Sequence, residues 1–282
     1  MAELPSNGSI RAAIIDIDGT LLRSDGTISV RTRRAVAGSI SRGVKIVLAT
    51  GRGFRAASPI AKDLGVSAPL ILHNGALVRD WLTGDLLVHQ HLAADLARIA
   101  ARIILRHECQ LIVYGNALQG ERILAGPAEL DSAPAARYLA RNGATLTRQP
   151  VADFPIVDDP IQLLVLDYPE KAEPLATALQ SPRWRTVTSV TTSTPGARLV
   201  EVMHADCSKS AAARWLAKSW DIHLSSVLAV GDNFNDLDLL ESAGIGVAMG
   251  NAPAELQERA DWVTATNQED GVAVALERFV LR

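Results

Sequence analysis

The chain has 282 residues, of which 48% are hydrophobic and 21% charged, and its formal net charge is −3. This length and composition allow a large core in one large domain or two linked ones, and they exclude a disordered chain and a disulfide-stapled miniprotein. Lys and Arg are scattered rather than clustered, so we expect no nucleic-acid partner.

The apolar runs fall far short of the roughly 20 residues that a membrane-spanning helix needs, so we expect no membrane protein. The N-terminus lacks the charged and apolar regions of a signal peptide, which favours a cytoplasmic protein. The two cysteines, Cys109 and Cys207, are far apart and form no CxxC motif, so we expect reduced thiols.

Over the first 80 residues, apolar strand-like runs alternate with helical stretches. We expect strands at 11–16, 44–49 and 69–72 and helices at 29–42 and 58–64, with Pro59 delaying the second helix. Parallel neighbours need crossover helices and are buried on both faces, so this alternation predicts a parallel α/β sheet with helices on both sides.

The last 75 residues repeat the alternation, whereas the middle of the chain does not. For the C-terminal part we expect helices at 209–219, 235–241, 253–259 and 271–280 and strands at 227–230, 245–248 and 262–263. For the middle we expect helices at 92–107, 132–141 and 172–180 and strands at 111–114, 122–124, 161–166, 184–187 and 199–203. The middle is therefore interpreted as an inserted α+β domain.

Two carboxylates follow the first predicted strand, in the string Asp16-Ile17-Asp18-Gly19-Thr20. Open α/β sheets bind ligands at the carboxyl ends of their strands, and side chains two residues apart can face one crevice. One acid could attack phosphorus and hold Mg²⁺ while the other protonates the leaving oxygen. The alternative is a solvated turn, since Asp-Gly is common in turns.

Thr50-Gly51-Arg52 follows the second strand, where a hydroxyl and free amides could bind a phosphoryl oxygen. A simple β-to-α turn is the alternative. The same stretch, Gly51-x-Gly53-x-x-Ala56, also resembles a dinucleotide-binding loop, although the next strand is followed by His73 and Asn74 rather than an acid.

Acids also follow the strand at 227–230, where Asp232 could complete a Mg²⁺ site with Asp16 and Asn235 could reach the phosphate. The alternative is a helix cap in the same turn. Lys209 begins the preceding helix, and it is one of only five lysines among 28 basic residues. A compact point charge there suits a phosphate pocket, but a surface lysine is an equal alternative.

Two further patterns are weaker. His89 and His91 could form part of a metal site, but without a third ligand in phase a solvated strand is favoured. Asn74-Gly75 could contact substrate or form only a hairpin turn between Ile71 and Val78.

Together, four motifs in this order resemble those of the haloacid dehalogenase superfamily of phosphatases, in its Cof-like type IIB branch. The matching segments are Asp16-Ile17-Asp18-Gly19-Thr20-Leu21, Ala49-Thr50-Gly51-Arg52, Ser208-Lys209 and Gly231-Asp232-Asn233-x-Asn235-Asp236, with Asn74-Gly75-Ala76 and Ala248-Met249-Gly250-Asn251-Ala252 in addition. The resemblance implies a Rossmann-like parallel-sheet core at 8–82 and 206–282, with an inserted α+β cap of type C2B at 83–205 that selects the substrate.

The resemblance also implies residue roles. Asp16 would be the nucleophile that forms an aspartyl-phosphate, and Asp18 the acid that protonates the leaving group and then activates water. Mg²⁺ would be held by Asp16, the Asp18 backbone carbonyl and Asp232, with Asp236 supporting the metal site.

For the phosphate, the resemblance implies that Thr50 and Lys209 bind the transferring group and that Asn235 contacts it. Gly51, Arg52 and Asn74 are the other candidate substrate-binding residues.

We therefore expect a Mg²⁺-dependent phosphatase acting on a small phosphomonoester such as a sugar phosphate, as a monomer or homodimer. A second acid at Asp18 favours phosphate esters over carbon–halogen bonds as substrates. The alternatives are a phosphomutase of the same superfamily, a dinucleotide-binding oxidoreductase, and a non-catalytic binding protein on the same fold.

Overall fold

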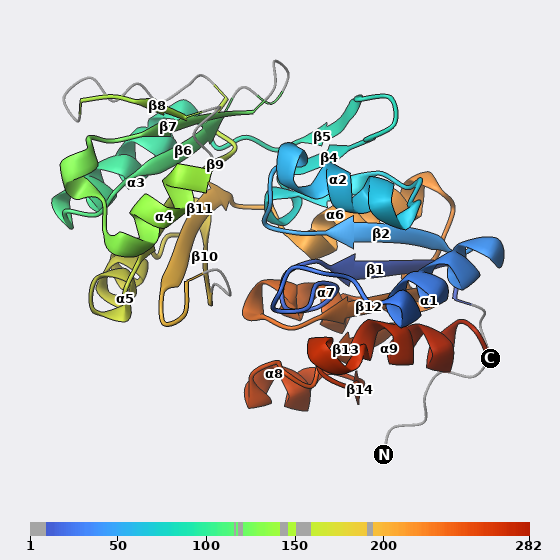
Figure 1. Cartoon of the computed structure of the whole chain (residues 1–282). Coiled ribbons are helices and arrows are strands. Elements are labelled where there is room, and N and C mark those ends of the chain that lie inside the picture. The colour runs from blue at the N-terminus through green and yellow to red at the C-terminus, as the bar shows by residue number, and fades with distance from the viewer. Residues whose placement is uncertain (1–9, 116, 118–120, 142–145, 151–158, 191–193) are drawn as a thin grey trace. The chain divides into compact units, whose positions relative to one another are not determined.

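The structure is a computed structural model that describes residues 10–115, 117, 121–141, 146–150, 159–190 and 194–282 (Figure 1). Its contacts divide the chain into two compact units. The core unit comprises residues up to Val88 and from Ser208 onward, and the inserted unit runs from His89 to Cys207. Residues 8 and 9 of the predicted core lie outside the described residues.

The core unit alternates strands and helices in both of its chain segments. Its strands are β1 (Ala12–Asp16), β2 (Lys45–Ala49), β3 (Leu70–Leu72), β4 (Leu77–Arg79), β5 (Leu86–His89), β12 (Val227–Gly231), β13 (Ile245–Ala248) and β14 (Trp262–Val263). Its helices are α1 (Val30–Ser41), α2 (Phe54–Leu64), α6 (Lys209–Ser219), α7 (Leu237–Ser242), α8 (Ala254–Arg259) and α9 (Gly271–Phe279).

The core strands form one sheet in the order β14-β13-β12-β1-β2-β3-β4-β5. From β14 to β3 all neighbours are parallel, and β1 lies between β2 and β12. All five residues of β1 and of β12 are buried, as expected for central strands covered on both faces. The chain builds outward from β1 in one direction and from β12 in the other, so the sheet has a topological switch point between these two strands.

Helices cover both faces of this sheet because right-handed crossovers in opposite directions place them on opposite sides. Helix α1 packs against α2 and α9, and α6 packs against α7, which also contacts α8 (Figure 1). Local sequence signals begin the helices: the Ser29 hydroxyl accepts from Thr32 N at α1, and the Ser208 hydroxyl accepts from Ala211 N at α6.

The core differs from the sequence prediction in two places. Its sheet is not parallel throughout, because the chain reverses at residues 73–75 and β4 pairs antiparallel with β3, with Ile71 opposite Val78. Strand β5 extends this edge, which assigns residues 83–88 to the core unit rather than to the insertion. The expected delay of α2 by Pro59 is wrong: the helix begins at Phe54 after an extended Gly53 cap and includes the proline.

The inserted unit is an α+β structure with a second sheet, ordered β10-β11-β9-β6-β7-β8. Its strands are β6 (Ile112–Gly115), β7 (Arg122–Ala125), β8 (Leu146–Arg148), β9 (Gln162–Asp167), β10 (Trp184–Val190) and β11 (Arg198–His204), and its helices are α3 (Ala94–Arg106), α4 (Ala133–Arg141) and α5 (Pro169–Ala178). All pairs are antiparallel except β7 with β8. The short β8 has no counterpart in the sequence prediction.

The two faces of this second sheet differ in character. One face packs against α3 and α5 in an apolar cluster that includes Val113, Leu163 and Val200. Side chains that alternate with these point to the other face, where Tyr114 contacts Tyr138 of α4 and Gln162 donates to Glu201 at 2.5 Å.

Among the described residues, no helix combines the length and apolar character that crossing a bilayer requires. Cys109 and Cys207 are both buried free thiols, as the sequence predicted.

Candidate active site

The carboxyl ends of β1 and β12 meet at the switch point of the core sheet. Asp16 is the last residue of β1, and Asp232 directly follows β12. The parallel register of these strands, with Ile15 opposite Val230, brings the two acids to one edge. Their side chains are almost buried, with 5% of Asp16 and 9% of Asp232 exposed.

The loop after β1 folds against Asp232. Gly19 adopts φ +79°, and a Cβ atom there would lie 2.2 Å from Asp232 Oδ2, so only glycine fits without displacing the carboxylate. Thr20 Oγ1 donates to Asp232 Oδ1 at 2.8 Å. Thr20 thus orients Asp232, a role that the sequence analysis missed although Thr20 lies in its first motif.

Helix α6 delivers Lys209 to the same edge. The residue 73–75 turn lies so close to the start of α6 that a Cβ on Gly75 would be 2.1 Å from the Ser208 carbonyl oxygen. Gly75, with φ +99°, permits this approach. Lys209 is therefore completely buried although it is a lysine.

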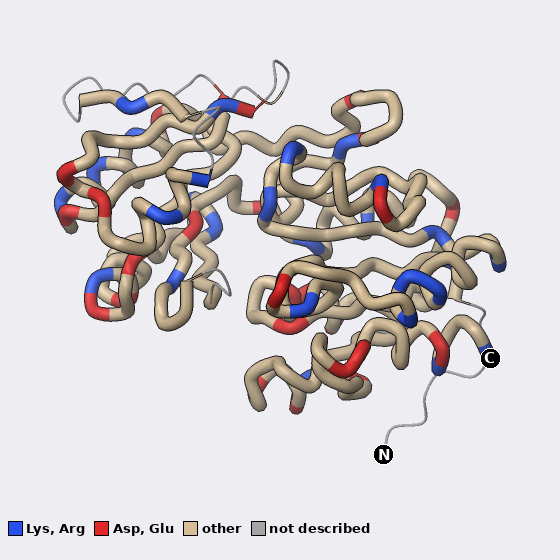
Figure 2. Tube along the Cα trace, viewed as in Figure 1, with Lys and Arg blue, Asp and Glu red and all other residues tan. Residues whose placement is uncertain are grey.

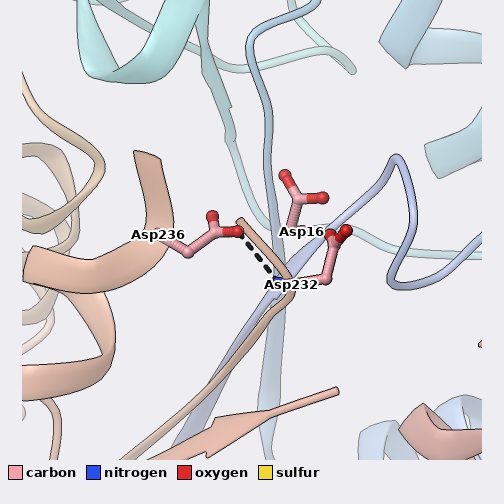
Figure 3. Close-up of side chains that lie close together, drawn as sticks. All are labelled: Asp16, Asp232 and Asp236. Atoms are coloured by element: carbon pink, nitrogen blue, oxygen red, sulfur yellow. Dashed lines mark hydrogen bonds between the residues drawn. The ribbon is translucent and has the colours of Figure 1, made fainter. Parts of the chain in front are cut away.

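Lys209 Nζ lies between two carboxylates. It donates to Asp16 Oδ1 at 2.5 Å and to Asp236 Oδ1 at 2.6 Å. The other oxygen of Asp236 accepts from the backbone N–H groups of Asp232 and Asn233, both at 3.1 Å. Figure 3 shows Asp16, Asp232 and Asp236 gathered around one point, with the Asp232–Asp236 bond dashed.

Burial and crowding of like charges dominate the electrostatics. Burial raises the pKa of Asp16 well above its ordinary range, against the opposing effect of Lys209. Burial and the charge of Asp236 raise the pKa of Asp232 to about 7, although the Thr20 hydrogen bond opposes this. For Lys209, burial lowers the pKa, but Asp16 and Asp236 outweigh it and the net shift is upward, so the ammonium stays charged.

This donor set suits a divalent cation. One oxygen from each of Asp16, Asp232 and Asp236 lies within 4.8 Å of the others, and this is the one such group of His, Cys or acidic residues in the described part of the chain. Lys209 pairs with Asp16 and Asp236 only, so full ionisation of the three acids leaves an excess of two negative charges. Hard oxygen donors with such an excess fit Mg²⁺, with Asp236 already engaged by Lys209 and the backbone.

Asp18 has a different partner from the other acids. Arg52 Nε and one Arg52 terminal nitrogen donate to its two oxygens, at 2.7 and 2.6 Å. This bidentate contact fixes the carboxylate of Asp18, whose side chain is 42% exposed. Arg52 was expected at the phosphate, and the structure places it on Asp18.

The remaining predicted residues lie around the same edge. The Thr50 hydroxyl accepts from Arg52 N at 3.1 Å, and Ala49 is the β2 partner of Asp16. Asn235 Nδ2 donates to Asn74 Oδ1 at 2.9 Å.

Asn74 belongs to the hairpin turn between Ile71 and Val78, as one of the two interpretations of Asn74-Gly75 predicted. This position does not exclude the other interpretation, in which Asn74 contacts substrate. A Cβ on Gly51 would lie 3.3 Å from Asn74 Nδ2. The structure thus brings Thr50, Gly51, Asn74 and Asn235 close to one another.

His89 is the last residue of β5 and the first residue of the inserted unit, in which His91 also lies. Their rings are 5.3 Å apart, and Asp159 Oδ2 is 4.0 Å from His89 Nε2. They do not form a compact ligand group with a third residue among the positions that the structure describes.

The chain is similar to known proteins over nearly its whole length. Residues 13–276 match the haloacid dehalogenase-like hydrolase family. Phosphatase YwpJ of Bacillus subtilis is 30% identical over 288 residues, covering 94% of this chain and 98% of the relative. The 5-amino-6-(5-phospho-D-ribitylamino)uracil phosphatase YcsE of the same organism is 29% identical over 274 residues, covering 96% of each chain.

Solved structures share the fold. A haloacid dehalogenase-like hydrolase from B. subtilis has a TM-score of 0.78 and 25% identity, covering 96% of this chain and all of the other. The subclass IIB sugar phosphatase BT4131 has a TM-score of 0.79 at 21% identity, covering 95% and 98%, which shows a common fold. With the family match over nearly the whole chain and phosphatases among its relatives, the chain belongs to the haloacid dehalogenase-like hydrolases, as a Cof-like phosphatase.

Proposed function

We propose that this enzyme is a Mg²⁺-dependent phosphatase that hydrolyses a small phosphomonoester, such as a sugar phosphate, through an aspartyl-phosphate on Asp16. The observation that carries the proposal is the buried group of Asp16, Asp232 and Asp236 at the sheet's switch point, with Lys209 Nζ bound to Asp16 and Asp236. Such a group has a nucleophile, a fixed cation and an excess of negative charge in one place.

Asp16, Asp232 and the backbone carbonyl of Asp18 would hold the metal, with Asp236 in a supporting position. When bound, Mg²⁺ neutralises charge on the transferring phosphoryl group and on the acids. Lys209 is already charged and fixed by two carboxylates, so it needs little reorganisation to stabilise the equatorial oxygens.

In the first step, a carboxylate oxygen of Asp16 forms a bond to phosphorus while the bond from phosphorus to the ester oxygen breaks. The electron pair goes to that oxygen, and Asp18 donates the proton that makes it an alcohol. Because Arg52 binds both oxygens of Asp18 in this structure, the Asp18 side chain has to leave at least one of these bonds before it donates.

In the second step, water attacks the aspartyl-phosphate at phosphorus. Asp18 accepts the proton of the water, the bond between phosphorus and Asp16 breaks, and inorganic phosphate and the original carboxylate are formed. Thr50, Gly51 and Asn235 would orient the phosphoryl group. The hydrogen bond from Asn235 Nδ2 to Asn74 Oδ1 would hold the Asn235 amide in place.

The substrate class is part of the proposal. A relative named as a phosphatase of a phosphorylated ribitylamino compound supports a phosphomonoester of a polyhydroxylated metabolite. The inserted unit, which occupies the place of the cap, would select among such substrates. The dinucleotide-binding interpretation of the Gly51 loop loses its support because the family is that of hydrolases.

The test is release of phosphate from p-nitrophenyl phosphate and a panel of sugar phosphates by wild type and Asp16→Asn, with Mg²⁺ or with EDTA. We expect Mg²⁺-dependent release that falls at least about 1,000-fold in Asp16→Asn, because the nucleophile is lost. Asp63→Asn, at a surface ion pair with Arg33, is the matched control and should retain wild-type turnover.

Full turnover by Asp16→Asn would contradict the mechanism, and release that persists in EDTA would contradict the metal requirement. A phosphomutase would return the group to a sugar hydroxyl. Isomerised sugar phosphate without free phosphate, followed by ³¹P NMR, would identify that alternative.

A further inference from the structure

The loop after β1 is held in place by a segment more than two hundred residues further along the chain. Asn251, shortly after β13, donates from Nδ2 to the backbone carbonyl oxygen of Gly19 at 2.9 Å. Its other amide atom, Oδ1, accepts from the backbone N–H of Asn267, also at 2.9 Å. The Asn251 side chain therefore joins the loop to the C-terminal part of the core unit through both of its polar atoms.

Further contacts from the same segment hold the outer part of the loop. Asn267 Nδ2 donates to the Leu22 carbonyl oxygen at 2.8 Å, and Arg23 forms an ion pair with Asp270 at 2.6 Å. These contacts lie beyond Leu22, toward the surface, whereas the Asn251 contact is made at Gly19. The two sets of contacts thus hold different parts of one loop.

The Gly19 peptide is in direct contact with the acidic group. A Cβ on Gly19 would lie 2.2 Å from Asp232 Oδ2, and Thr20, the next residue, donates to Asp232 Oδ1. The residue before Gly19 is Asp18. A shift of the Gly19 peptide would therefore move both of its neighbours: Asp18, the proposed acid, and Thr20, whose hydroxyl orients Asp232.

We propose that Asn251 is a positioning residue for this reaction: its N–H···O bond to Gly19 fixes the loop that carries Asp18 and Thr20 and thereby sets the orientation of Asp232. The inference rests on the proposed function, because it assigns Asn251 a role through groups that act in that reaction. Hydrogen bonds that hold the residues around a metal site affect both metal affinity and turnover, since they orient the residues that bind the metal.

The substitution Asn251→Asp separates the two contacts of this side chain. Aspartate keeps the shape and the oxygen that accepts from Asn267 N, but it places an oxygen instead of an N–H group against the Gly19 carbonyl. Asn267→Asp is the matched control, because it removes the corresponding bond to Leu22 in the outer part of the loop and leaves its own backbone N–H for Asn251. Asn251→Ala removes both contacts of Asn251.

The experiment measures kcat and KM for p-nitrophenyl phosphate, Mg²⁺ binding by calorimetry, and the thermal midpoint for all four proteins. We expect Asn251→Asp to lower kcat by roughly 10- to 100-fold and to weaken Mg²⁺ binding by about tenfold, with KM changed less than about twofold. Asn267→Asp should lower the thermal midpoint similarly but change kcat less than about threefold, because the peptide beside Asp232 stays fixed.

Two results would overturn the inference: an Asn251→Asp variant with the kcat and Mg²⁺ affinity of wild type, or an Asn267→Asp variant that loses as much kcat as Asn251→Asp. In both cases the proposed function would stand as long as the wild-type enzyme is an active phosphatase. A wild-type chain that neither releases phosphate nor binds Mg²⁺ would overturn both. If wild type binds Mg²⁺ without releasing phosphate, the proposed function fails, and the calorimetric comparison of Asn251→Asp still decides whether Asn251 sets the orientation of Asp232.

Discussion

The core unit and the inserted unit both bury polar side chains, but they do so in different parts of a sheet. In the core unit, Asp16, Asp232 and Lys209 meet at the ends of parallel strands and the start of a helix, where the backbone also presents N–H groups. In the inserted unit, Gln162 at the start of β9 donates to Glu201 within the neighbouring antiparallel strand β11. Figure 2 shows acidic and basic residues in both units.

Because of this difference, the buried polar groups of the core unit can take part in a reaction, whereas those of the inserted unit stabilise the fold. Strand ends leave a polar side chain room to meet a ligand, and in the core unit three carboxylates lie together while one ammonium pairs with only two of them. In the inserted unit, Tyr114 with Tyr138 and Gln162 with Glu201 form hydrogen-bonded pairs on a covered face, which lowers the cost of burying them. Variants in the two units should therefore affect different measurements.

The largest effect is expected for Lys209→Met. The change leaves Asp16 and Asp236 buried without the ammonium between them, so the free energy of unfolding should fall by about 3–5 kcal/mol and phosphatase activity should be lost. Urea denaturation in EDTA measures the stability. Lys218→Met, at an exposed position of the same helix, is the control, and an equal denaturation midpoint in both variants would contradict the prediction.

A smaller effect, on stability alone, is expected in the inserted unit. Glu201→Ala removes the acceptor of the buried Gln162 amide, which should cost about 1–3 kcal/mol of unfolding free energy. Glu201→Gln keeps an acceptor and most of the volume and should cost less. Turnover of p-nitrophenyl phosphate should stay within about twofold of wild type, because hydrolysis of a small aryl ester depends mainly on the groups of the core unit. A large fall in kcat would show that the inserted unit contributes to the chemistry itself.

Arg52→Lys should reduce activity without a comparable loss of stability. Lysine keeps the charge but cannot make the two parallel bonds to Asp18, so kcat for alkyl phosphates should fall by about tenfold. Nitrophenyl esters need less protonation of the leaving oxygen and should be less affected. Arg55→Lys, exposed in the first turn of α2 three residues further on, is the control. Equal losses for both ester types would argue against a role of Arg52 through Asp18.

The smallest effect is a change in how stability varies with pH in the metal-free protein. The pKa of Asp232 is raised to about 7 in the folded state, above its ordinary 3.8, so its contribution to stability is present at low pH and is lost as pH rises toward 7. The thermal midpoint of wild type in EDTA should fall relative to that of Asp232→Asn between pH 5 and about pH 7. Mg²⁺ should remove the penalty, and a pH-independent difference would contradict the assignment.

Much of the core could be predicted because its signals are local. The predicted helix 209–219 coincides with α6, and the strand at 11–16 differs from β1 by one residue, since apolar runs and a serine cap define them. Asp16 and Asp232 were found because each directly follows a buried strand. By contrast, β4, β5 and β8 are short or partly exposed and lack a clear pattern of alternation. The helix at α2 was predicted to begin too late, because Pro59 was expected to delay it although the helix contains this proline.

Side-chain partners were less predictable than positions. Arg52 follows the second strand as expected. Its guanidinium donates to both oxygens of the Asp18 carboxylate, however, and is not free to bind phosphate in this structure. Thr20 was part of a quoted motif, but its bond to Asp232 spans 212 residues and has no local signature. The Gln162–Glu201 pair likewise depends on the register of β9 and β11.

The sequence by itself determined which strand ends carry acids, where Lys209 begins its helix, and that glycine occupies the positions of closest approach. These features depend on neighbours within a few residues, where strand alternation, capping and backbone sterics act. Only the tertiary structure decided that Lys209 lies between Asp16, 193 residues away, and Asp236, 27 residues away. That arrangement follows from the pairing of β1 with β12, which brings distant segments to one low-dielectric edge where charges must find partners.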